Sequence, residues 1–118
     1  MPDRQLPLFP GGGEHALTRH SRLIDAIQPF LDRLHFEGRS PHTINAFHSD
    51  LRLVCEYFGD DMLLDDFTTT KLNRFLEWME SGRGVPCSRK SYAWRVTTLK
   101  VFFKFLYDEK IMPDNPAS

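Results

Sequence analysis

The sequence predicts an all-α protein, a bundle of four helices behind a short N-terminal tail. Apolar residues recur three and four positions apart in four separate stretches, and no stretch alternates polar and apolar residues as a half-buried strand does. Serine or threonine caps precede three of these stretches, and glycine or proline follows each of them. Helices joined by connections this short are typical of a bundle.

The first helix is predicted from residue 21 to about residue 38. Its inward face carries Leu23, Ile24, Ile27, Phe30, Leu31 and Leu34. Because proline lacks a backbone N–H and clashes with the preceding turn, Pro29 predicts that this helix is kinked or split. Residues 1–17 hold three prolines and a run of three glycines, so we expect a disordered tail there.

The second helix has the clearest boundaries. Ser40 is a good N-cap, Pro41 suits the first helical position, and Gly59 follows the last apolar residue. One apolar stripe runs between them, made of Ile44, Phe47, Leu51, Val54, Cys55 and Phe58. Residues 60–66, which hold four aspartates, are predicted to form a connecting loop.

Two further helices complete the predicted bundle. The third begins at a threonine cap, Thr68 or Thr69, and ends in the glycine- and proline-containing segment 81–86. The fourth begins near Ser88 and ends around residues 108–110. Their predicted inward residues are Leu72, Phe75, Leu76 and Met79 in the third, and Tyr92, Val96, Leu99, Phe103 and Leu106 in the fourth. Residues 18–112 then form one domain, and residues 113–118 an exit linker.

Composition narrows the function classes. The 118 residues are 41% hydrophobic and carry a formal net charge of −1, which excludes a strongly cationic protein of the histone kind. No apolar run is long enough to cross a membrane as a helix. The two cysteines, Cys55 and Cys87, form neither a disulfide framework nor a CxxC pair, so we expect a cytosolic protein with reduced thiols.

The charges are unevenly distributed along the chain. Residues 81–107 contain six basic residues and no acidic one, whereas acids concentrate in the loop at 60–66. At about 100° per residue, the outward side of the fourth helix carries Lys90, Trp94, Thr97, Val101 and Lys104, with Arg95 and Thr98 on its flanks. The outward side of the second helix carries His42, Asn45, Ser49 and Arg52. Cations mixed with hydrogen-bonding side chains are the types that read base edges in the major groove.

Two other interpretations of these faces stay open. They are either ordinary solvated helix surfaces, or a protein-interaction surface without DNA contact, centred on Trp94, Val101 and Phe105. No residue pattern supports an enzyme site or a metal site. The aspartates at 60–66 lack the spacing of a calcium loop, and His42 and His48 are not at the i, i+4 spacing of helical metal ligands. We therefore expect no metal and no cofactor.

Two blocks of the sequence resemble the core-binding N-terminal domain of tyrosine recombinases, also called phage integrases. Residues 40–51 read SPHTINAFHSDL and are similar to the family pattern S-p-x-T-x-x-x-Y-x-x-D-L, with Phe47 at the usual tyrosine. Residues 95–106 read RVTTLKVFFKFL and are similar to R-l-s-a-L-R-x-F-F-x-[FWY]-L. The segment Asn115-Pro116-Ala117 resembles the N-P-[AS] that leads into the family's catalytic domain.

The resemblance implies a SAM-like core-binding domain that forms one half of a C-shaped clamp around duplex DNA. It implies that the second and fourth helices approach the major groove and that further protomers of the same recombinase assemble on the DNA. The DNA-binding residues carried over or placed beside these positions are His42, Thr43, Asn45, Arg52, Arg89, Lys90, Ser91, Trp94, Arg95 and Thr98. The family's catalytic residues lie in a domain that would begin after Ser118, so we expect this chain to bind DNA and not to cleave it.

Overall fold

The computed structural model describes residues 16–84 and 87–118, and it is all-α, as predicted. The four α-helices are α1 (Leu23–Phe36), α2 (Pro41–Phe58), α3 (Thr69–Glu77) and α4 (Arg89–Asp108). A short 3₁₀ turn, η1 (Leu64–Asp66), precedes α3, and a π-helical turn, η2 (Trp78–Gly82), extends it. None of the described helices has the length and hydropathy needed to cross a membrane.

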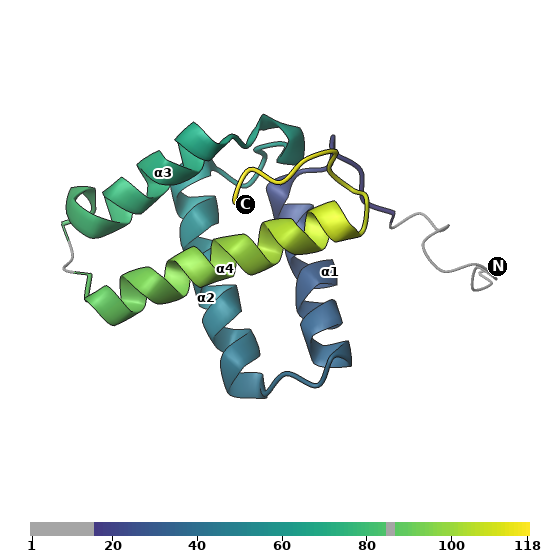
Figure 1. The fold of residues 1–118 in the computed structure, drawn as a ribbon, viewed down its shortest axis with the longest axis horizontal. Helices are drawn as coiled ribbons and strands as arrows, with labels where there is room; N and C mark the ends of the chain where they lie inside the picture. Colours follow the sequence, from purple (N-terminus) through teal and green to yellow (C-terminus); the bar gives the residue numbers. More distant parts are fainter. Residues whose placement is uncertain (1–15, 85–86) are drawn as a thin grey trace.

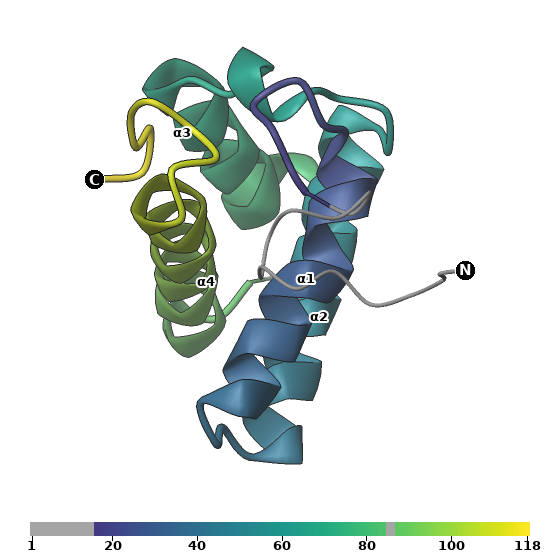
Figure 2. The same cartoon turned by 90° about the vertical axis from the view of Figure 1, so that its right-hand side faces the viewer.

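The helices are arranged as a hairpin with a third helix laid across it. α1 and α2 run antiparallel and pack side by side, and α4 crosses both of them (Figure 1). Turned by 90°, the molecule shows α4 on one side of this hairpin, with α3 close to α4 (Figure 2). α4 is therefore covered on two flanks, by the hairpin on one and by α3 on the other.

Side-chain caps start three of the helices where the sequence predicts them. The Ser40 hydroxyl accepts the backbone N–H of Thr43 at 3.1 Å, and Thr68 and Ser88 make the same contact at the starts of α3 and α4. Gly59 ends α2 with φ at +94°, a conformation that side-chain-bearing residues rarely adopt. These local signals explain why the predicted helix boundaries are close to the observed ones.

Pro29 does not split α1, so the alternative of two shorter helices is wrong. The segment is helical from Leu23 to Phe36 with Pro29 inside it. Proline removes one backbone hydrogen bond from a helix interior. Buried side chains on both sides of Pro29, including Ile27 and Phe30, hold the segment on α2 and α4 and compensate for that loss.

Two connections contain more structure than predicted. The loop at 60–66 includes η1, whose Leu64 is fully buried, and α3 continues through η2, which buries Met79. Val85, Pro86 and residues 1–15 of the predicted tail lie outside the described residues. At the end of that tail, Leu17 packs against the core.

The buried side of α4 is wider than the predicted stripe. Leu99, Phe103 and Leu106 are buried as expected, but Thr98 and Phe102 are fully buried as well. Because α4 packs on two flanks, its buried arc exceeds the single stripe of an amphipathic surface helix. The prediction that Thr98 flanks an outward face is therefore wrong.

The segment after α4 turns back onto α3. The Thr69 hydroxyl donates a hydrogen bond to the carbonyl of Pro116 at 2.8 Å, and Ala117 packs partly buried against the core. Met112 is buried at the end of α4. Residues 113–118, predicted as an exit linker, thus contact the bundle in this structure.

Candidate nucleic-acid interface

An open groove of about 500 Å³ lies between the first halves of α2 and α4. The two helices diverge from the point where they cross (Figure 1). Side chains from these two halves line the groove and form its two walls. The residues of α2 that line it are His42, Thr43, Ala46, Ser49 and Asp50. The residues of α4 that line it are Lys90, Ser91, Trp94 and Arg95. Six of the ten residues predicted to bind DNA are therefore gathered here: His42, Thr43, Lys90, Ser91, Trp94 and Arg95.

The other four predicted residues lie elsewhere. Arg89 is exposed in the first turn of α4, next to Lys90. Asn45 is exposed on α2, and Arg52 lines a different pocket, between α2 and α1. Thr98 has no exposed surface, so it cannot touch a ligand in this conformation.

A buried polar network joins the two walls beneath the groove. Asp50 of α2 is only 6% exposed, and its Oδ2 accepts a hydrogen bond from the Thr98 hydroxyl of α4 at 2.7 Å. Its Oδ1 lies 3.5 Å from Nε of Arg95, and Nη1 of Arg95 donates to the Cys87 sulfur at 3.6 Å. The two sequence blocks that carry the family resemblance are thus tied together by Asp50, Thr98 and Arg95.

The sequence reasoning missed Asp50, although a signal for it was present. Asp50 stands among apolar positions of the second helix, directly before Leu51, and a lone carboxylate at such a position predicts a buried partner. Burial raises the pKa of Asp50 above its ordinary value, and the Thr98 hydroxyl and the Arg95 charge partly oppose this shift. Arg95 is thereby held against the floor of the groove, with 17% of its side chain exposed.

Trp94 forms an aromatic part of the groove floor. Its ring stacks on the buried ring of Phe47 at 5.2 Å between centroids and 29° between planes, and 37% of the residue stays exposed. The predicted patch of Trp94, Val101 and Phe105 is not exposed as a unit. Val101 and Phe105 are partly buried. The Phe105 ring lies 5.5 Å from the Phe30 ring, between centroids, and the Arg33 guanidinium lies over the Phe105 ring at 5.5 Å from its centroid.

The rim of the groove is cationic. Arg89 and Lys90 are exposed at its α4 end, and His42 is exposed at its α2 end. Among the lining residues the one acid is Asp50, which is engaged with Arg95. The acidic loop follows the far end of α2, where Asp61 pairs with Arg22 at 2.9 Å. Among the residues that the structure describes, neither Arg89 nor Lys90 is in an ion pair, so the open end of the groove carries positive charge.

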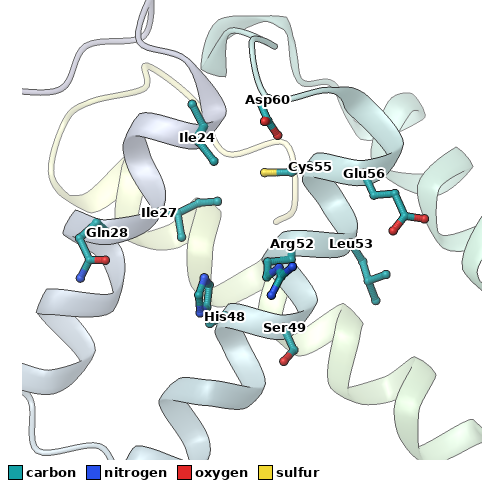
Figure 3. A pocket seen from close by; sticks show the side chains of 10 residues that line it. All are labelled: Ile24, Ile27, Gln28, His48, Ser49, Arg52, Leu53, Cys55, Glu56 and Asp60. Atoms are coloured by element: carbon teal, nitrogen blue, oxygen red, sulfur yellow. The ribbon is translucent and has the colours of Figure 1, made fainter.

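A second, larger pocket lies between α1 and α2 (Figure 3). The charged residues that line it are Arg52 and the acidic Glu56 and Asp60, and His48 of α2 lies beside them. Among the described residues, no group of three or more histidines, cysteines and acids could hold a metal ion.

Cys55 in this pocket gives a test of the packing between α1 and α2. Burial raises the pKa of its thiol to about 11, and the negative charge of Asp60 adds to the shift. At pH 8 we expect iodoacetamide to modify the half-buried Cys87 and to leave Cys55 unmodified, because the thiolate is the reactive form. Mass spectrometry of tryptic peptides counts the labels. Both cysteines should react in urea, and equal rates in the folded protein would contradict the burial of Cys55.

A protein-family model matches most of the chain. The family described as "Phage integrase, N-terminal SAM-like domain" matches residues 27–110, which include both walls of the groove. No solved structure matches the chain significantly.

Curated relatives are similar over the same region. Tyrosine recombinase XerC of Chromobacterium violaceum is 31% identical over 94 residues, which cover 80% of this chain and 30% of that protein. Tyrosine recombinases XerD of Vibrio cholerae and of Proteus mirabilis are 24% and 32% identical, over 78% of this chain in each case. The chain spans about 30% of the length of these relatives.

Proposed function

Because this chain belongs to the phage integrase N-terminal SAM-like domain family, we propose that it is the DNA-binding part of a site-specific tyrosine recombinase. The observation that carries the proposal is the groove between α2 and α4, which has a cationic rim and is lined by the first family-like block and by the first half of α4, where the second block begins at Arg95. Strand cleavage and joining are assigned to the part of the relatives that this chain does not cover. Other protomers bound to the same DNA are the proposed protein partners, and the cytosolic location stays a prediction.

The geometry suits a duplex. A major groove about 12 Å wide admits a helix. The phosphates along its two edges then contact the side chains on either side of that helix. In our proposal the first halves of α2 and α4 face one major groove, with Arg89 and Lys90 on the phosphates. The first turns of both helices also present backbone N–H groups and the positive end of the helix dipole.

Several predicted residues take different roles in this proposal. His42, Lys90 and Ser91 stay candidates for direct contact, because they line the groove near its open end. Arg95 contributes from the floor, where Asp50 orients it. Thr98 supports Asp50 and makes no direct contact. Asn45 and Arg52 contact DNA only if the duplex extends over the exposed side of α2.

A comparison of two lysines on one helix tests the proposal. Lys90→Ala should weaken binding to a mixed-sequence duplex roughly three- to tenfold at low salt, and should reduce the slope of log affinity against log salt by about 0.9, the value for one phosphate contact. Lys100→Ala is the matched control, since Lys100 lies on the opposite flank of α4 and lines a pocket with Leu72 and Leu76 of α3. Fluorescence anisotropy at several salt concentrations measures both quantities.

The two variants remove the same charge, but only Lys90→Ala is expected to weaken DNA binding. If Lys100→Ala weakens binding as much as Lys90→Ala, the effect comes from net charge and not from the groove. If the unmodified chain fails to bind duplex DNA at low salt, the DNA-binding proposal is wrong, and the protein-interaction reading of these faces takes its place.

A further inference from the structure

We propose that the groove floor formed by Trp94 and Ala46 contacts the C5 methyl group of thymine, and so gives the chain a base preference. The inference rests on the proposed DNA-binding function and adds to it the chemical group that the floor recognises. Trp94 and Ala46 come from facing helices and line the same groove. The thymine methyl is the apolar group that the edges of the four standard bases present in the major groove.

Trp94 is held in place as a fixed apolar surface. Stacking on Phe47 restrains the indole ring, because Phe47 is itself buried between α1 and α4 and packs edge-on against Phe30 at 5.9 Å. An aromatic ring that is stacked on one face and partly exposed cannot leave the groove without breaking a core contact. Its exposed part is therefore available to a ligand without the cost of ordering a flexible side chain.

Several polar groups around the floor are engaged within the protein. The Thr43 hydroxyl accepts a hydrogen bond from the Ser40 hydroxyl at 3.0 Å, and the Ser91 N–H is bound by Ser88. Asp50 and Arg95, which also line the groove, pair with each other. Hydrogen-bond reading of bases is thus left to side chains such as Lys90 and Ser91, whereas Trp94 and Ala46 offer apolar contact.

The combination of floor and rim selects among possible occupants. An apolar peptide would gain from Trp94 but not from exposed Arg89 and Lys90, and a plain polyanion would gain from the rim but not from the floor. A thymine-containing major groove presents both features at once, a methyl group between two rows of phosphates. Charge complementarity thus assigns duplex DNA as the occupant of this groove.

Replacing thymine by deoxyuracil tests the inference, because uracil keeps every hydrogen-bonding group and lacks only the methyl. Duplexes that bind the chain are first selected from a random-sequence pool, and each thymine of the best duplex is then replaced in turn. We expect at least one replacement to weaken binding by the unmodified chain roughly three- to tenfold. Trp94→Ala should bind the thymine and uracil forms of that duplex equally.

Phe36→Ala is the matched control, because Phe36 is an exposed aromatic residue on α1 outside the groove. It should keep the full preference for thymine. Equal binding of all thymine and uracil duplexes by the unmodified chain overturns the inference and leaves the proposed function standing. Failure to select any duplex at low salt overturns the proposed function instead. The comparison of thymine and uracil duplexes with the unmodified chain tests the inference even if Trp94→Ala does not fold.

Discussion

Replacing Asp50 by alanine should destabilise the folded chain by about 3 kcal/mol, because it leaves the half-buried Arg95 charge without its partner. The same change removes the 2.7 Å hydrogen bond between Asp50 and the buried Thr98 hydroxyl, which keeps only its bond to the Trp94 carbonyl at 3.2 Å. Urea unfolding followed by circular dichroism measures the free energy of unfolding. A loss below 1 kcal/mol would show that the network does not hold α2 and α4 together.

A double-mutant cycle separates the pair from the single residues. Asp50→Ala combined with Arg95→Ala should cost less than the sum of the two single changes, with a coupling of about 1 to 3 kcal/mol. Asp25→Ala is a useful comparison, because Asp25 pairs with Arg22 on the exposed side of α1 at 2.9 Å. That surface pair should contribute little to the free energy of unfolding, because solvent screens the attraction between exposed charges.

The titration of Asp50 gives the network a pH signature. Burial raises its pKa in the folded chain, so the folded state binds a proton more tightly than the unfolded state does. The stability that this proton contributes is present below the ordinary aspartate pKa and is lost as the pH rises through the raised value. As the pH rises from the ordinary aspartate pKa through the raised one, the unmodified chain should therefore lose stability relative to Asp50→Asn. A difference that does not change with pH would contradict the raised pKa.

Local signals in the sequence explain which helix boundaries could be predicted. The caps at Ser40, Thr68 and Ser88 act within one helical turn, so their effect depends little on tertiary structure. The π turn after α3 carried no comparable signal. It follows from the packing of Met79 into the core, which residues distant in sequence create.

The faces of α4 could not be predicted in the same way. Helical periodicity identifies one apolar stripe, but α4 contacts the hairpin and α3 on different flanks. Thr98 and Arg95 are polar by residue type and became part of the buried side only because Asp50 lies opposite them. A pairwise contact between residues 48 positions apart leaves no periodic trace in the sequence.

The sequence predicted which two helices form the candidate site, but it did not predict the contacts between their residues. The resemblance placed residues of the second and fourth helices near DNA, and the fold brings six of them to one groove. Arg52 lies ten residues after His42 along α2, beyond the half of the helix that lines the groove, and it lines the pocket beside α1. The crossing of α2 and α4 decides which outward residues share a surface, and that crossing depends on the core.

Phe30→Ala should be among the most destabilising single changes, at about 4 kcal/mol. The Phe30 ring is 1% exposed and packs edge-on against Phe47 at 5.9 Å and Phe102 at 5.2 Å, so it joins α1 to both α2 and α4. Its loss removes aromatic contacts worth roughly 0.5 to 1.5 kcal/mol each and leaves a cavity at the crossing. For a domain of this size, the melting temperature should fall by roughly 15 to 30 °C.

Phe36→Ala provides the control on the same helix with the same atoms deleted. Phe36 is 87% exposed at the end of α1, so its removal should change the free energy of unfolding by less than about 0.5 kcal/mol. The two changes should also differ in their effect on the groove, because Phe30 packs on Phe47 and Phe47 supports Trp94. Phe30→Ala should therefore weaken DNA binding even at a temperature where the variant is still folded, while Phe36→Ala should not. Equal destabilisation by the two changes would contradict the observed packing of the hairpin beneath α4.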